Sequence, residues 1–278
     1  MMHRKSAPAF AALAAAALTI SNSAFAQAAA PAAEPAPASP ITANVTLTTN
    51  YKFRGQDQDV LGSNGNFKTS AVKPAIQGGF DYAHESGFYL GNWNSSVNWL
   101  DGNSIEMDVY GGYKFKGGGI DWDVGALGYI YPGATAGNTW ELYGAGTYAS
   151  AFGAFTLKYS HTVSDDYFNW AGAKGGSGLS GRNTGYLNLG YAYEVVPKLT
   201  LKAGVGYTFF ASDIKDNTTA ANYLDYSVGA SYDFGGGLAL GGYVQGANKG
   251  SSFEVTGADG KTLNPNKARF IVALTKTL

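Results

Sequence analysis

Along most of this chain, apolar and polar side chains alternate at every second position. The closing segment shows the pattern, because Phe270, Val272, Leu274 and Leu278 share one parity. A pleated strand directs successive side chains to opposite faces, so each such segment is expected to be a strand with one apolar and one mostly polar face. About a dozen of these segments follow one another with no helical stretch between them. The pattern therefore predicts an all-β fold that closes into a barrel.

The connections between the expected strands also follow a pattern. Short Gly-rich connections alternate with mostly longer ones, and only 100–103 departs from this order. An even strand number with short turns at one end and long loops at the other is typical of transmembrane antiparallel up-and-down barrels of the outer membrane. We expect about twelve strands, at 43–55, 70–82, 88–99, 104–115, 120–131, 139–148, 154–162, 184–194, 199–210, 222–234, 238–248 and 267–278.

Aromatic residues of the apolar parity gather near both ends of the expected strands. With the short turns in the periplasm, the external group is Tyr51, Phe53, Trp99, Trp140, Tyr159, Tyr207, Phe209, Tyr226 and Phe270. The periplasmic group is Phe80, Tyr82, Tyr89, Tyr113, Phe115, Trp122, Tyr148, Phe155, Tyr191, Tyr193, Tyr232 and Phe234. Two aromatic girdles around an aliphatic band suit a barrel whose apolar face meets lipid. A soluble β-sandwich, the alternative, would concentrate its rings in mid-strand.

Composition divides the chain into three parts. Residues 1–26 have the basic start, the apolar stretch and the Ala24-Phe25-Ala26 end of a cleaved secretory signal. Residues 27–40 form an Ala/Pro-rich lead expected to be disordered, and 41–278 form the barrel. The formal net charge of −1 does not favour a nucleic-acid partner. The absence of cysteine excludes a disulfide framework and thiolate metal sites.

The opposite parity of the expected strands carries charged residues that would line the lumen. One wall is expected to hold four basic residues, namely Lys52, Arg54, Lys73 and Arg269. An acidic arc is expected to face it, with Glu106, Asp108 and Glu141, extended toward the periplasm by Asp121 and Asp123. Four further residues complete an interior of mixed charge, namely Lys158, Lys202, Asp225 and Asp233. Opposed charges can orient polar solutes in a constriction. Alternatively, they pair across a narrow lumen and plug it.

Catalytic, cofactor and metal sites find little support in the sequence. After the signal, the histidines are His84, in an expected turn, and His161, on the outward parity. Ser160 has the opposite parity and Ser164 lies in a loop, so neither is placed to give its proton to His161. We therefore expect no catalytic residue, cofactor or metal ion. The loop 163–183 is expected either to fold into the pore mouth or to pack on itself.

Five segments carry a resemblance to a known family. They are TNYKFRG at 49–55, GGFDYAHESGFY at 78–89, KYS at 158–160, DYF at 166–168 and LTKTL at 274–278. With these segments the mature chain resembles the TorF-type, Gcw_chp-like family of proteobacterial porins. The resemblance implies an outer-membrane barrel. One departure is Leu278, because outer-membrane barrels usually end in an aromatic residue that the assembly machinery recognises.

These observations predict a porin-like channel in the cell outer membrane of a Gram-negative bacterium, which passes small hydrophilic solutes by diffusion through a mixed-charge constriction. A structural or adhesive barrel with a plugged lumen is the alternative, and an outer-membrane lipid hydrolase is the least favoured reading. The expected partners are membrane lipid and lipopolysaccharide, the barrel-assembly machinery at the last strand, and the solutes themselves.

Overall fold

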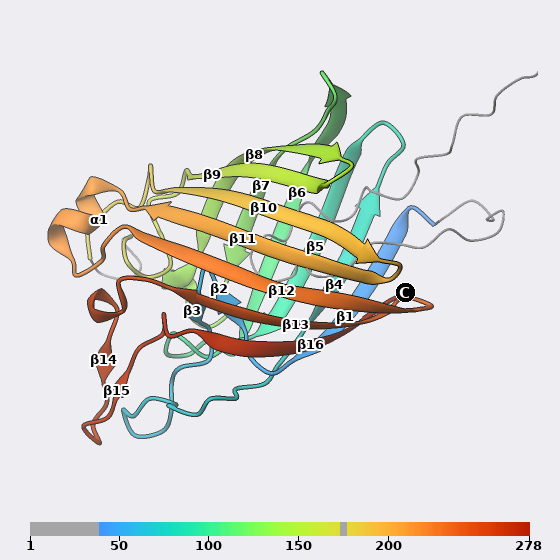
Figure 1. Ribbon diagram of the computed structural model, residues 1–278. Coiled ribbons are helices and arrows are strands. Elements are labelled where there is room, and N and C mark those ends of the chain that lie inside the picture. Colours follow the sequence, from blue (N-terminus) through green and yellow to red (C-terminus); the bar gives the residue numbers. More distant parts are fainter. Residues whose placement is uncertain (1–38, 173–176) are drawn as a thin grey trace, which may run out of the picture.

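The computed structural model describes residues 39–172 and 177–278. Its main body is a closed barrel of twelve strands, each antiparallel to both neighbours (Figure 1). The predicted signal peptide at 1–26 lies outside the described residues. The same holds for the lead up to residue 38 and for 173–176 of the Gly-rich loop.

Each of the twelve predicted segments corresponds to one barrel strand, so the predicted fold class is confirmed. The strands are β1 (Ile41–Thr48), β4 (Ala75–Ala83), β5 (Phe88–Ser96), β6 (Ile105–Gly117), β7 (Ile120–Ile130), β8 (Thr139–Ser150), β9 (Gly153–Thr162), β10 (Gly185–Val196), β11 (Leu199–Phe209), β12 (Tyr223–Gly235), β13 (Leu238–Ala247) and β16 (Arg269–Thr277). Consecutive strands pair around the wall, and β1 pairs with β16 to close it.

The two ends of the barrel differ in their connections. One end has tight turns such as 118–119 and 236–237, where glycines adopt the left-handed conformation that a two-residue turn requires. The other end has long loops, and these contain the helix α1 (Ser212–Asn217) and the hairpin of β14 (Val255–Thr256) and β15 (Thr262–Leu263). Figure 1 shows the C-terminus at the tight-turn end. None of the helices in the described ranges has the length and apolar character needed to cross a membrane.

The outer surface of the barrel is apolar, as the alternation predicts. Leu142, Val228 and Leu274 are exposed in mid-strand, and exposed rings such as Trp140 and Phe234 lie toward the two strand ends. Most of the predicted outward aromatic residues are therefore placed correctly. The prediction is wrong at four positions, Tyr51, Phe53, Tyr89 and Trp99.

Tyr89 and Trp99 are misplaced because β5 has the reverse parity to the one predicted. Tyr89 and Trp93 point into the barrel and are only 5% exposed, whereas Phe88 and Leu90 face outward. Trp99 lies beyond the end of β5 and packs edge-on against Tyr131. The odd-numbered residues of β5 are more apolar than the even-numbered ones, which led to the wrong prediction. They point inward because the interior here contains an aromatic cluster against which their rings pack.

Tyr51 and Phe53 are misplaced because the first strand ends at Thr48, well before residue 55. The chain then turns inward and forms a small hairpin of β2 (Lys52–Phe53) and β3 (Gln56–Asp57) inside the barrel (Figure 1). Arg54 and Gly55 make its two-residue turn with φ angles of 44° and 79°. Positive φ at both central positions belongs to the turn type that matches the twist of a hairpin.

Candidate functional site

The β2–β3 hairpin crosses the lumen from one wall to the opposite one. At its tip, a Cβ atom on Gly55 would lie 2.7 Å from the Gly246 carbonyl oxygen and 2.8 Å from the Asp225 Cβ, so the tip packs on β12 and β13. At its start, the Tyr51 hydroxyl donates to Glu106 on β6 at 2.5 Å. Since β6 and β12 are six strands apart in a ring of twelve, the hairpin bridges the full width of the barrel.

Three of the four predicted basic residues gather on one carboxylate that the sequence did not single out. Asp57 of the hairpin lies 3.0 Å from Lys52, 2.7 Å from Lys73 and 2.5 Å from Arg269. Burial alone would raise the pKa of Asp57, but the Arg269 hydrogen bond and the two ammonium groups outweigh it and hold the pKa below its usual value. The three basic residues therefore share one carboxylate, which offsets part of their charge within their own wall.

The fourth basic residue, Arg54, reaches the acidic wall directly. Its guanidinium donates to both oxygens of Glu141 at 2.8 and 2.7 Å, and both side chains are almost completely buried. The guanidinium also lies 4.2 Å from the centre of the Tyr186 ring, a distance typical of a cation–π contact. Arg54 and Glu141 thus form the ion pair that joins the predicted basic wall to the acidic arc. The other three basic residues pair with Asp57 instead.

Several of the other acidic residues accept hydrogen bonds from tyrosines. Glu106 accepts from the hydroxyls of Tyr51 and Tyr131, each at 2.5 Å. In the same way, Asp123 accepts from Tyr89 at 2.6 Å, Asp225 from Tyr186 at 3.1 Å, and Asp81 from Tyr110 at 2.6 Å. A phenol stabilises a carboxylate without cancelling its charge, because the donor is neutral. Each of these carboxylates therefore keeps its negative charge where it is ionised.

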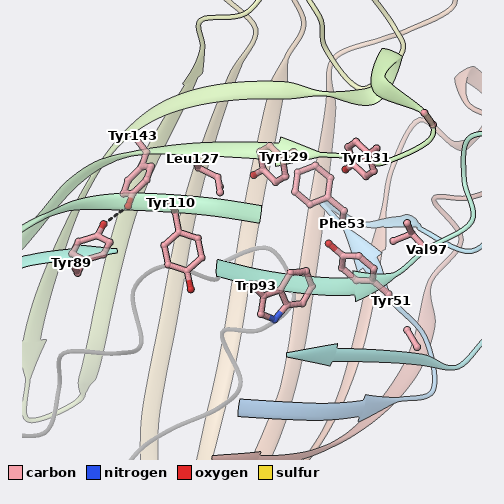
Figure 2. Close-up of a cluster of buried hydrophobic side chains, with 12 residues drawn as sticks. Tyr51, Phe53, Tyr89, Trp93, Val97, Tyr110, Leu127, Tyr129, Tyr131 and Tyr143 are labelled. Atoms are coloured by element: carbon pink, nitrogen blue, oxygen red, sulfur yellow. Dashed lines mark hydrogen bonds between the residues drawn. The ribbon is translucent and has the colours of Figure 1, made fainter. Parts of the chain in front are cut away.

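Several of these tyrosines lie flat along the wall, above glycines of the next strand. Tyr89 pairs in register with Gly112, and Tyr143 pairs with Gly125. A Cβ on either glycine would lie 2.5 Å from the hydroxyl of its tyrosine. The two hydroxyls meet above β6 and β7, as Figure 2 shows. The glycines thus make room for rings that cover the wall, and such rings project less into the lumen than upright ones would.

Two other predicted residues lie closer to the tight-turn end. The Lys158 ammonium is buried and lies 4.1 Å from the centre of the Tyr143 ring. Asp121 forms a 2.8 Å ion pair with exposed Lys116 near the tight turn of β6 and β7, away from the lumen centre. Asp108 is buried in the acidic arc, and its Oδ1 has no hydrogen-bond partner among the described residues.

The loop after β9 folds over the lumen at the long-loop end of the barrel. Phe168 packs on Phe53 of the hairpin at 5.1 Å between ring centres and on Tyr129 of β7 at 5.0 Å. Tyr167 accepts a hydrogen bond from Arg54 at 3.4 Å, and Trp170 packs on Phe253 of another loop. The two expectations for this loop are both met, since it enters the mouth and packs with its neighbours there.

In the described ranges, His161 is not placed beside either of the two serines close to it in sequence. The His161 ring is hydrogen-bonded to Tyr159 at 3.4 Å, whereas Ser160 is buried in the interior. The Ser164 hydroxyl donates to the carbonyl of Asp166. The part of the chain that the structure describes contains no group of three or more residues suited to hold a metal ion.

Asp57 and the inward tyrosines were the residues that sequence reasoning missed. The local signal for Asp57 was weak, because Gly55 permits a tight turn but Gln56 and Asp57 after it are both polar and show no alternation. The inward direction of Tyr89 had no such signal, since the parity of β5 favours the opposite face.

Comparison with solved structures places the fold among porins. The chain is similar to the KdgM porin, with 11% sequence identity, coverage of 84% of this chain and 98% of that chain, and a TM-score of 0.52. It is similar to the NanC porin, with 10% identity, coverage of 85% and 98%, and a TM-score of 0.51. KdgM in complex with disordered oligogalacturonate matches with 11% identity, coverage of 85% and 97%, and a TM-score of 0.50. At this identity the similarity shows a shared barrel fold.

Comparison by sequence adds the family. No curated protein matches the chain. The model of a family described as bacterial proteins of unknown function, Gcw_chp, matches residues 32–278, which is most of the chain. The chain therefore belongs to the Gcw_chp family.

Proposed function

We propose that this protein is an outer-membrane channel of the TorF type that passes small hydrophilic solutes by diffusion. The observation that carries the proposal is the contrast between the two faces of the closed barrel. Exposed aliphatic and aromatic side chains form the outer face, while charged residues such as Arg54, Glu141 and Lys158 lie inside. A barrel with an apolar outer band and a polar interior is the arrangement of outer-membrane channels.

The same contrast supports the proposed location and partners. The outer band would contact membrane lipid and lipopolysaccharide, with the long loops outside the cell. The barrel-assembly machinery would engage β16. Leu278, the residue directly after this strand, is 74% exposed and accessible to it. The signal at 1–26 would direct export, and cleavage would follow Ala26.

The lumen charges support a preference for small solutes of low net charge. The four basic residues near the long-loop end share two carboxylates, Asp57 and Glu141, so each cation already has an anionic partner and is less available to an acidic solute. The hairpin also narrows the outer half of the lumen. We therefore propose the predicted pore-lining residues other than Asp121 as a constriction of mixed charge, with Arg54 and Glu141 at its narrowest part.

Single-channel recording in a planar bilayer tests the proposal. We expect small, stable conductance steps from the wild-type barrel, and larger steps from Arg54→Ala, which releases the hairpin from the acidic wall. The matched control is Lys261→Ala, because exposed Lys261 pairs with Asp259 at 3.1 Å in the turn between β14 and β15.

A plugged barrel is the second candidate, and the hairpin that spans the lumen favours it. In that case the wild-type protein gives no conductance at any salt concentration, whereas Arg54→Ala or a shortened hairpin opens it. Absence of steps from the wild-type barrel and from both variants would contradict the channel in either form.

A further inference from the structure

One strand, β5, departs from the outward pattern of the other eleven. Elsewhere, polar non-aromatic side chains occupy outward strand positions only near strand ends, as at Ser150, His161 and Lys276. On β5 the outward residues after Leu90 are Asn92 and Asn94, followed by Ser96 at the strand end. Both asparagines are partly exposed, and Asn92 is the central residue of the strand.

The depth of these amides follows from the register. Asn92 pairs with Phe80 of β4 and with Val109 of β6, and Val109 in turn pairs with Gly128, the partner of Trp140. Phe80 belongs to the periplasmic aromatic girdle and Trp140 to the external one. Asn92 therefore lies between the two girdles, at the level of the aliphatic band.

The hydrogen bonds of the two amides are incomplete. Asn92 donates to Asn94 at 3.0 Å, and Asn94 donates to Asn92 at 3.2 Å and to the Gly78 carbonyl at 3.2 Å. An amide has two N–H donors and two acceptor lone pairs. One N–H of Asn92 and one lone pair on each amide oxygen are left over. Hydrocarbon offers no partner for them, and an unsatisfied polar group there is costly.

We infer that this face of β5 is the contact surface for a second copy of the same chain. This inference rests on the membrane location proposed above. A partner must carry hydrogen-bonding groups at the same depth, which the hydrocarbon tails of lipid do not have. Two copies inserted in the same direction meet those needs across a twofold axis along the membrane normal, because identical patches then face each other at equal height. An amide is both donor and acceptor, so the spare Asn92 N–H of each copy binds an amide oxygen of the other.

The surroundings of the pair suit such a contact. Gly78, which pairs with Asn94, has no side chain, and the other partner of Asn94 is the flexible Met107. Small residues beside polar ones allow close approach and interchain hydrogen bonds in membranes. On the opposite side of the barrel the outward residues of β10, such as Leu187 and Leu189, offer lipid only apolar groups.

Cysteine cross-linking in the membrane tests the inference directly, because the chain has no cysteine of its own. Asn94→Cys is expected to form a disulfide-linked dimer on mild oxidation, at least tenfold more than the matched control Leu189→Cys on β10. Equal cross-linking at the two positions would overturn the inference, since it would reflect random collision.

A second measurement asks whether the amides hold the dimer together. The double variant Asn92→Leu/Asn94→Leu places residues on β5 that suit lipid, so the barrel should still fold. We expect its dimer dissociation constant in micelles to rise at least tenfold over that of the wild type, with Leu187→Val/Leu189→Val as the control. An unchanged constant, or a wild-type protein that bleaches in single steps at every lipid dilution, would contradict the inference. Neither readout needs conductance, so failure of the channel proposal would show separately.

Discussion

Two sectors of the barrel wall treat their inner and outer faces differently. In the sector of β10 to β13, the outer face is aliphatic and aromatic, and the inner face combines buried rings such as Tyr186 and Tyr243 with small residues such as Gly190, Gly204 and Ser227. In the sector of β5 to β8, large rings such as Tyr89 and Trp93 lie inside, and amides reach the outer face of β5.

This difference shows that the alternation of apolar and polar residues does not by itself determine which face of a strand points to lipid. Where the lumen contains a packed cluster, the apolar side chains of a strand can be stabilised inside as well as outside. In the β5 sector, the hairpin ring of Tyr51 packs edge-on against Trp93 at 5.6 Å, which gives inward rings a partner. In the sector of β10 to β13, inward rings such as Tyr223 also have partners, for example Phe253 at 5.2 Å, but there the outward positions are apolar and the strands keep the usual direction.

The largest expected effect comes from truncating an inward ring of β5. Trp93→Ala should lower the free energy of unfolding by about 3–5 kcal/mol, because it removes a buried ring from a packed cluster. Urea unfolding of the barrel refolded in micelles measures this loss. The control Val228→Ala faces outward on β12 and should cost much less. Similar losses for both variants would break the comparison of the two sectors.

A smaller loss is expected from filling the space under a wall tyrosine. Gly125→Ala would place a Cβ 2.5 Å from the Tyr143 hydroxyl and from the Gly111 carbonyl oxygen, so unfolding should become easier by about 1–3 kcal/mol. In the other sector, the nearest atoms to a Cβ on Gly190 lie 3.9 Å away. Gly190→Ala should therefore stay within about 0.5 kcal/mol of the wild type. The same unfolding experiment compares both, and a reversed order would refute the role given to the glycines.

Ion selectivity should move in opposite directions when the two charge groups are changed. A unit charge acts on a passing ion with about 1 kcal/mol at 4 Å in water, or about fivefold in local concentration. Asp57→Asn leaves Lys52, Lys73 and Arg269 uncompensated and should favour anions by up to that factor. Glu106→Gln removes a negative charge and should likewise shift the selectivity toward anions. Lys73→Gln removes a positive charge and should shift it toward cations. Reversal potentials in a salt gradient measure the shifts, and a cation preference in Asp57→Asn would contradict the assignment.

The smallest effect is a dependence of stability on acid. The pKa of Asp57 lies below its unfolded value near 4, so its ion pairs stabilise the fold above that pH, and this contribution disappears as the pH falls through the folded pKa. The urea midpoint should fall between pH 6 and pH 3 by more in the wild type than in Asp57→Asn. Equal falls would show that other carboxylates account for the acid response.

Local pattern was enough to predict the barrel, its strand number and most of its outer face. Each of those features depends on side-chain parity within one strand or on loop length. The interior could not be derived in the same way. The inward turn after Thr48, the three contacts of Asp57 and the reversal of β5 depend on residues far apart in sequence, such as Asp57 with Arg269 and Tyr51 with Glu106. For the same reason, the lumen residues were predicted as a group, but their pairing was not.

The Asp57 cluster also bears on how the cylinder is held shut. The register of β1 with β16 contains five residue pairs, against eight between β1 and β4, so the seam where the two chain ends meet is short. Asp57 ties Arg269, the first residue of β16, to Lys73, just before β4, and both flank β1. The β2–β3 hairpin, which narrows the lumen, thus also acts as a clasp: its Asp57 joins the two strands on either side of β1. A hairpin that left the lumen would loosen that clasp, which couples the width of the passage to the integrity of the wall.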